Sequence, residues 1–163
     1  AGLGAARGRV MGEWRLRVVG KGNAARYAAQ AGRLGIDGRV EFAGPQPDMP
    51  AEYGRADLLL FPTLYDAFGT VTLEAMATGI PVVVSRQAGS SEVVDDRVDG
   101  RIVEDPRDPA ELAAAVEPLV NDPALRAKMG LAARAKAEQN GIDANIEKVV
   151  ALYREIAREK GRG

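Results

Sequence analysis

The sequence contains neither cysteine nor histidine among its 163 residues. Without cysteine there can be no disulfide and no thiolate-ligated metal site. Without histidine there is no imidazole to act as a base, a nucleophile or a metal ligand near neutral pH. A hydrolase with a Ser-His-Asp triad and a histidine-ligated zinc enzyme are therefore excluded for this chain.

The sequence also lacks a large excess of one charge, and it lacks long apolar runs. The 22 basic residues are spread along the chain and balance 23 acidic ones, so neither nucleic acid nor an anionic membrane is an expected partner. No apolar run reaches the roughly 18 residues that cross a membrane. The first ten residues lack the apolar centre of a signal peptide, and we expect a cytoplasmic protein.

The remaining composition, with 46% apolar and 28% charged residues, is that of a soluble globular protein. Residues 1–13 are rich in Gly, Ala and Arg without a clear period, and we interpret them as a loose N-terminal segment. Residues 14–163 are enough for one domain with its own core.

Five short, mostly apolar segments bounded by Gly or Pro predict strands at residues 14–20, 39–44, 57–62, 80–85 and 101–104. Helical patterns separate most of them, at 21–35, 50–56, 69–78 and, as a short helix and turn, 90–100. Such alternation predicts a doubly wound α/β domain with a Rossmann-like parallel sheet. Ligands bind at the carboxyl ends of such strands, which are the loops after residues 19, 43, 61 and 84.

Capping residues predict two more helices near the C-terminus. Asp108 and Pro109 suit a helix start, and Glu111 is placed to complete a capping box. Asp122 and Pro123 repeat the arrangement. A final helix is predicted by one apolar stripe, made of Ile142, Ile146, Val149, Val150, Tyr153 and Ile156.

The loop "PTLYDAFGT" (62–70) leads from a predicted strand directly into a helix. Backbone N–H groups at a helix start favour anions, and Gly69 would let a phosphate approach closely. Glu74 is either a ligand for a ribose diol or a solvated surface residue. Asp66 is either part of the same site or a turn-forming aspartate.

A second glycine loop, "VVGKGN" (18–23), follows the first strand but does not match GxGxxG. Lys21 could contact a phosphate or simply be solvated. The acids in "VVDDRVDG" (93–100) lack the Asp-x-Asp spacing of a metal–diphosphate site, and we expect no metal.

The segments "VVGKG", "RVEFAG", "ADLLLFPT", "DAFGTVTLEAMATGIPVVVS" and "DGRIVE" occur in the order seen in the C-terminal half of retaining GT-B glycosyltransferases of the "glycosyl transferases group 1" type. The resemblance covers roughly residues 14–155. The central block of that family reads Glu-x-Phe-Gly-x4-Glu-Ala. Here Asp66 replaces the first glutamate and Glu74 matches the second.

The resemblance implies roles for individual residues. Glu74 would bind the ribose hydroxyls of a donor nucleotide, and Asp66 would contact the hydroxyls of the donor sugar with a side chain one methylene shorter. The diphosphate would meet backbone N–H groups of Gly69, Thr70 and Val71. The base would lie near Gly44 and Pro45.

The implied function is donor binding in a metal-independent enzyme without a cofactor, which transfers a hexose from a UDP-sugar to an acceptor hydroxyl. Among family members the chain looks most like bacterial transferases that build lipopolysaccharide or other cell-surface glycans, at the inner face of the membrane. A GT-B-like epimerase or phosphorylase domain and a non-catalytic nucleotide-binding or protein-interaction fragment are the alternatives.

Two features of the family are not recognisable in the sequence. One is a first strand followed by a glycine-rich turn with a basic pair, and the other is the N-terminal acceptor domain. We therefore expect the isolated chain to be inactive. If the final helix docks on that missing domain, its exposed stripe should cause weak self-association.

Overall fold

Strand β4 (Val82–Ser85) is the middle strand of a parallel sheet in the computed structural model, which describes residues 13–160. It pairs with β3 (Leu59–Phe61) on one side and with β5 (Gly100–Val103) on the other. All four residues of β4 are buried. A strand that is buried along its whole length and does not alternate between apolar and polar residues is typical of a parallel sheet that is covered on both faces.

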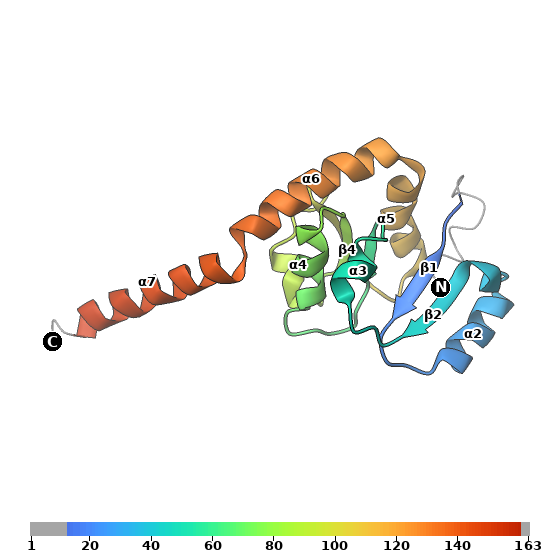
Figure 1. The fold of residues 1–163 in the computed structure, drawn as a ribbon, viewed down its shortest axis with the longest axis horizontal. Coiled ribbons are helices and arrows are strands. Elements are labelled where there is room, and N and C mark those ends of the chain that lie inside the picture. The colour runs from blue at the N-terminus through green and yellow to red at the C-terminus, as the bar shows by residue number, and fades with distance from the viewer. Residues whose placement is uncertain (1–12, 161–163) are drawn as a thin grey trace.

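Helices cover both faces of this sheet. Val82 and Val84 point to a core shared with α4 (Thr70–Ala77) and α6 (Pro123–Gln139). Val83 points to the opposite face and packs with α5 (Pro109–Asn121). This alternation follows from the period of two along a strand. In Figure 1, α6 runs along one side of the molecule next to α4.

A second, two-stranded parallel sheet is formed by β1 (Leu16–Val19) and β2 (Val40–Gly44). Helix α2 (Ala24–Arg33) and the short 3₁₀ helix η1 (Asp37–Arg39) connect its strands, and β1, β2 and α2 lie together at one end of the molecule (Figure 1). Among the described residues, the two large apolar clusters include no residue before Met49. The smaller sheet therefore does not share the main apolar core, and its own set of apolar contacts is much smaller.

In the sequence, helix α3 (Met49–Tyr53) follows the smaller sheet and precedes the larger one. Its side chains make polar contacts with the smaller sheet. Asp48 caps it, because its Oδ1 accepts a hydrogen bond from the N–H of Ala51 at 3.0 Å. Arg17 of β1 donates through Nε and a terminal nitrogen to the carboxylate of Glu52, at 2.6 and 3.2 Å. Bidentate pairs of this kind fix orientation as well as distance.

The predicted α/β fold with parallel strands is confirmed, and each of the five predicted strands is present. The short predicted helix over 90–100 is a 3₁₀ helix, η2 (Gly89–Glu92). The predicted loose segment falls almost wholly on residues 1–12, which lie outside the described part of the chain.

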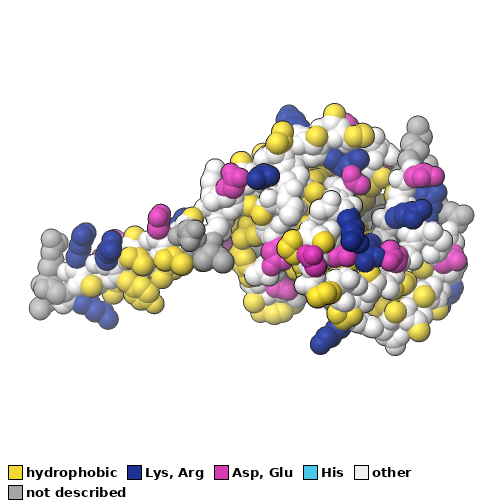
Figure 2. All heavy atoms as spheres, viewed as in Figure 1, with side chains coloured by type: hydrophobic (Ala, Val, Ile, Leu, Met, Phe, Trp, Pro, Cys, Tyr) yellow, Lys and Arg dark blue, Asp and Glu magenta, His cyan; other side chains and the backbone are white. Residues whose placement is uncertain are grey.

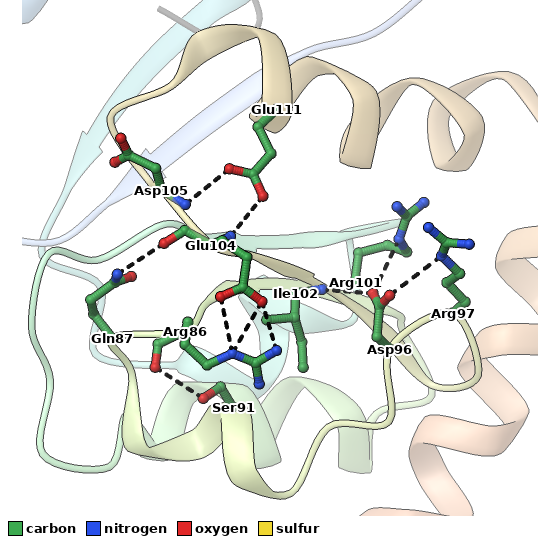
Figure 3. Close-up of polar contacts among 10 residues, drawn as sticks. All are labelled: Arg86, Gln87, Ser91, Asp96, Arg97, Arg101, Ile102, Glu104, Asp105 and Glu111. Carbon is green, nitrogen blue, oxygen red and sulfur yellow. Dashed lines mark hydrogen bonds and ion pairs between the residues drawn. The ribbon is translucent and has the colours of Figure 1, made fainter.

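The capping box predicted at Glu111 is wrong. Asp108 does cap α5, since its Oδ1 accepts from the N–H of Ala110 at 2.8 Å. Its own N–H donates to the carbonyl of Asp105, however, so no free donor remains for Glu111. The Glu111 carboxylate instead accepts from the N–H groups of Glu104 and Asp105, at 2.7 and 2.9 Å (Figure 3). It thereby ties the start of α5 to the end of β5.

The last helix, α7 (Ile142–Lys160), projects from the body of the molecule (Figure 1). Most of the predicted stripe is exposed, and the side chain of its first member, Ile142, lies outside the described part. Figure 2 shows apolar side chains gathered along one side of the projecting helix. The exposed large apolar residues of α7 are Ile146, Val149, Val150, Leu152, Tyr153 and Ile156. Within residues 13–160, no helix is long and apolar enough to cross a membrane.

Candidate functional site

The loop between β3 and α4 follows the carboxyl end of a parallel strand, where ligands bind in open α/β sheets. Asp66 lies at its centre. Its Oδ1 accepts from the N–H of Phe68 at 3.0 Å, which is the turn-forming role that aspartate often has. Its Oδ2 accepts no hydrogen bond from the described residues. One carboxylate oxygen thus shapes the loop, and the other is left for a ligand.

The neighbouring loop, residues 86–91, holds this segment in place. The N–H of Asp66 donates to the carbonyl of Gln87 at 3.3 Å, and the N–H of Gly89 donates to the carbonyl of Asp66 at 3.0 Å. The N–H of Ser90 donates to the carbonyl of Phe68. Three backbone hydrogen bonds therefore join the two loops that follow β3 and β4.

Figure 3 shows how the second loop is itself fixed to the end of β5. Arg86 forms an ion pair with Glu104, with 2.7 Å between the closest nitrogen and oxygen, and this lowers the pKa of the Glu104 carboxyl. The side chain of Gln87 donates to the carbonyl of Glu104 at 2.9 Å. Hydrogen bonds and an ion pair thus connect the loops after β3, β4 and β5 to one another.

Helix α4 is preceded by its N-cap residue Gly69, which has the left-handed φ of 76° that glycine tolerates best. A Cβ at this position would lie 2.7 Å from Cε1 of Phe61, so space as well as conformation requires glycine. The helix has no side-chain cap. Among the described residues, the N–H groups of Gly69, Thr70 and Val71 have no acceptor. Unpaired donors at a helix start are suited to an anion.

Glu74 lies one turn further along α4 and is exposed. Its Oε2 accepts a hydrogen bond of 2.8 Å from the hydroxyl of Tyr53, at the end of α3. Burial of Tyr53 and, secondly, this hydrogen bond raise the pKa of the phenol above its usual value. Both residues line a hollow of about 480 Å³ between α3 and α4, together with Met49, Pro50, Ala77 and Thr78.

A second hollow, of about 350 Å³, lies at the carboxyl ends of β1 and β2. It brings together three of the predicted residues, namely Lys21, Gly44 and Pro45. Gly44 has a φ of 68°, and its carbonyl accepts from the N–H of Gly20 at 3.0 Å, which holds the two strand ends together. Val18, Tyr27 and Phe42 supply apolar walls.

The predicted site residues thus fall into three groups: the hollow of Lys21, the turn from Asp66 to Val71, and the hollow of Glu74. The two hollows share no lining residue. Sequence reasoning missed Tyr53 and Gly89, because nothing local marks a hydrogen bond between helices or a close backbone contact. The described residues contain no group of three or more potential acidic metal ligands.

Known proteins resemble this chain in sequence and in fold. A family model described as "Glycosyl transferases group 1" matches residues 4–122. The D-inositol 3-phosphate glycosyltransferase of Salinispora tropica is 37% identical over 131 residues, which are 79% of this chain and 27% of that protein. The chain therefore spans little more than a quarter of that relative.

Two solved structures are similar in fold. Anabaena HepE in complex with UDP-glucose superposes with a TM-score of 0.79 at 28% identity, over 94% of this chain and 44% of HepE. The C-terminal domain of LpcC, a glycosyl transferase group 1 family protein from Francisella tularensis, has a TM-score of 0.74 at 22% identity. That match covers 84% of this chain and 75% of the LpcC domain, and it shows likeness of fold.

Proposed function

Because the chain belongs to the glycosyl transferases group 1 family and matches the C-terminal half of the GT-B fold, we propose that it binds the nucleotide-sugar donor of a retaining, metal-independent glycosyltransferase. The donor is a UDP-hexose, and the acceptor is a hydroxyl of a cell-surface glycan. The observation that carries the proposal is the uncapped start of α4 next to Glu74. HepE, which has the same fold, is known in complex with UDP-glucose.

In this proposal the N–H groups of Gly69, Thr70 and Val71 bind the diphosphate. Their hydrogen bonds and the helix dipole stabilise the charge that develops on the leaving UDP. Glu74 accepts hydrogen bonds from the two ribose hydroxyls. Asp66 contacts hydroxyls of the sugar, and the hollow at Gly44 and Pro45 receives the base, with Lys21 near the phosphates.

The acceptor side of the reaction would lie outside this chain. A reaction in a cleft between two domains needs both domains, because their closure excludes water and aligns the acceptor. The chain covers 27% of its Salinispora tropica relative and 44% of HepE. We therefore propose that it binds donor but does not transfer sugar alone, and that the full enzyme works in the cytoplasm at the inner face of the membrane.

Titration of the purified chain with UDP tests the donor site. We expect saturable binding, and we expect Glu74→Ala to weaken it at least about tenfold, because hydrogen bonds to a charged group contribute about 1.5–3 kcal/mol. Isothermal titration calorimetry gives both dissociation constants. Glu147→Ala, an exposed glutamate of α7, is the matched control and should bind UDP like the parent chain. Absence of binding, or equal binding by both variants, would contradict the proposal.

The exposed stripe of α7 leads to a second prediction, on assembly. We propose that it docks on the acceptor domain of the full enzyme and that, in this chain alone, it causes weak self-association. Sedimentation velocity should show mass rising with concentration. Replacing Val149 and Tyr153 with lysine should give a monomer at every concentration, whereas Arg154→Ala should leave association unchanged. A parent chain that stays monomeric at high concentration would refute this.

A further inference from the structure

Tyr53 forms the one hydrogen bond that the Glu74 side chain makes to the described residues. Only 5% of Tyr53 is exposed, and its ring packs in the larger apolar cluster with Ala75 and Met76. The hydroxyl emerges from this cluster at the wall of the hollow that Glu74 also lines. A rigid, buried ring thus directs a donor at an exposed, flexible carboxylate.

The element that carries Tyr53 is fixed from several sides. Asp48 caps α3, and Glu52, the residue before Tyr53, pairs with Arg17 of β1. Arg17 also pairs with Glu41 of β2. The position of the Tyr53 hydroxyl is therefore set by the smaller sheet and by the apolar cluster together, and it does not depend on the flexible side chain of Glu74.

A glutamate on the surface of a helix samples several rotamers, and each rotamer directs its two oxygens differently. A ribose diol needs both oxygens in one orientation. The Tyr53 hydroxyl occupies one acceptor direction at Oε2, and about three of the roughly four acceptor directions of the carboxylate remain. Holding Glu74 in advance would remove the cost of ordering it when the nucleotide binds.

We propose that Tyr53 is a positioning residue, which holds the Glu74 carboxylate in the orientation that accepts hydrogen bonds from the 2′- and 3′-hydroxyls of the donor ribose. The inference rests on the proposed function, because it assigns Tyr53 to the same nucleotide site. Tyr53 itself does not contact the reacting atoms. A purely structural tyrosine, which only fills the cluster, would affect stability without distinguishing between ligands.

The test compares two ligands, UDP and 2′,3′-dideoxyuridine 5′-diphosphate, on the parent chain and on Tyr53→Phe. Phenylalanine keeps the ring and removes only the hydroxyl. We expect UDP to bind about two- to tenfold more weakly to the variant, because the freed Glu74 side chain must then be ordered when the nucleotide binds. Binding of the dideoxy ligand should not change, because it has no diol for Glu74 to accept from. Tyr153→Phe, on the projecting helix, should match the parent chain with both ligands.

A double variant separates action through Glu74 from other effects. In the Glu74→Ala background, Tyr53→Phe should cause no further loss of UDP affinity. Equal losses for both ligands, no loss for UDP, or a further loss in that background would overturn the role of Tyr53. A parent chain that binds UDP and the dideoxy ligand equally would instead refute the ribose site itself, and one that binds neither would refute the proposed function.

Discussion

Alanine at position 89 will lower the free energy of unfolding by about 3 kcal/mol, in the range that overpacking costs. A Cβ on Gly89 would lie 2.2 Å from the carbonyl oxygen of Ala67 and 2.9 Å from its carbon. Backbone atoms cannot rotate away as a side-chain end can. The φ of Gly89 is not positive, so close approach, and not backbone conformation, requires glycine here.

The same substitution should weaken UDP binding, because Gly89 and Ser90 hold the loop of Asp66 and Phe68 through backbone hydrogen bonds. Chemical denaturation and calorimetric titration measure the two effects. Gly38→Ala is the matched control, since Gly38 also lies in a 3₁₀ helix and its added Cβ would meet nothing within 4 Å. If Gly89→Ala unfolds at the same denaturant concentration as Gly38→Ala, the close contact is not a constraint.

Alanine at position 130 should destabilise the protein to a similar degree, by about 2–3 kcal/mol. Gly130 is buried within α6, and an added Cβ would lie 2.1 Å from the carbonyl oxygen of Gly79, just after α4. Glycine inside a helix normally costs about 0.5–1 kcal/mol relative to alanine. The contact with Gly79 must therefore outweigh a gain in helix propensity.

Gly32 provides the opposite case within α2. Its added Cβ would meet nothing within 4 Å, so Gly32→Ala should stabilise the protein by about 0.5–1 kcal/mol. Thermal unfolding followed by circular dichroism should show the two melting temperatures moving in opposite directions. A stabilising Gly130→Ala would mean that α6 can shift away from α4 without loss of packing.

Local patterns were sufficient to predict the strands and most of the helices. The run Leu58–Phe61 is apolar and ends at Pro62, and the run Val82–Val84 lies between Pro81 and polar residues, so each identified a buried strand. The capping roles of Asp108 and Asp122 were predicted for the same reason, since a cap depends on residues two or three positions away.

Contacts between residues that are far apart in the sequence could not be predicted from local patterns. The division of five parallel strands into two sheets depends on pairing across the molecule. Glu111 had the spacing of a capping box, yet its carboxylate accepts hydrogen bonds from N–H groups at the end of β5 instead. Tyr53 and Glu74 are 21 residues apart, and no local rule joins them. The roles of the site residues toward a ligand stay predictions.

The division into two sheets has a consequence for cooperativity. The part of the chain from β1 to β2 shares neither large apolar cluster with the rest, so it should open locally at a lower free energy than β4 and its helices. A nucleotide that lies across the hollow at Gly44 and the start of α4 would contact both parts at once. Donor binding would then stabilise the less stable region against local opening. The largest decrease in amide exchange on binding would appear in the smaller sheet.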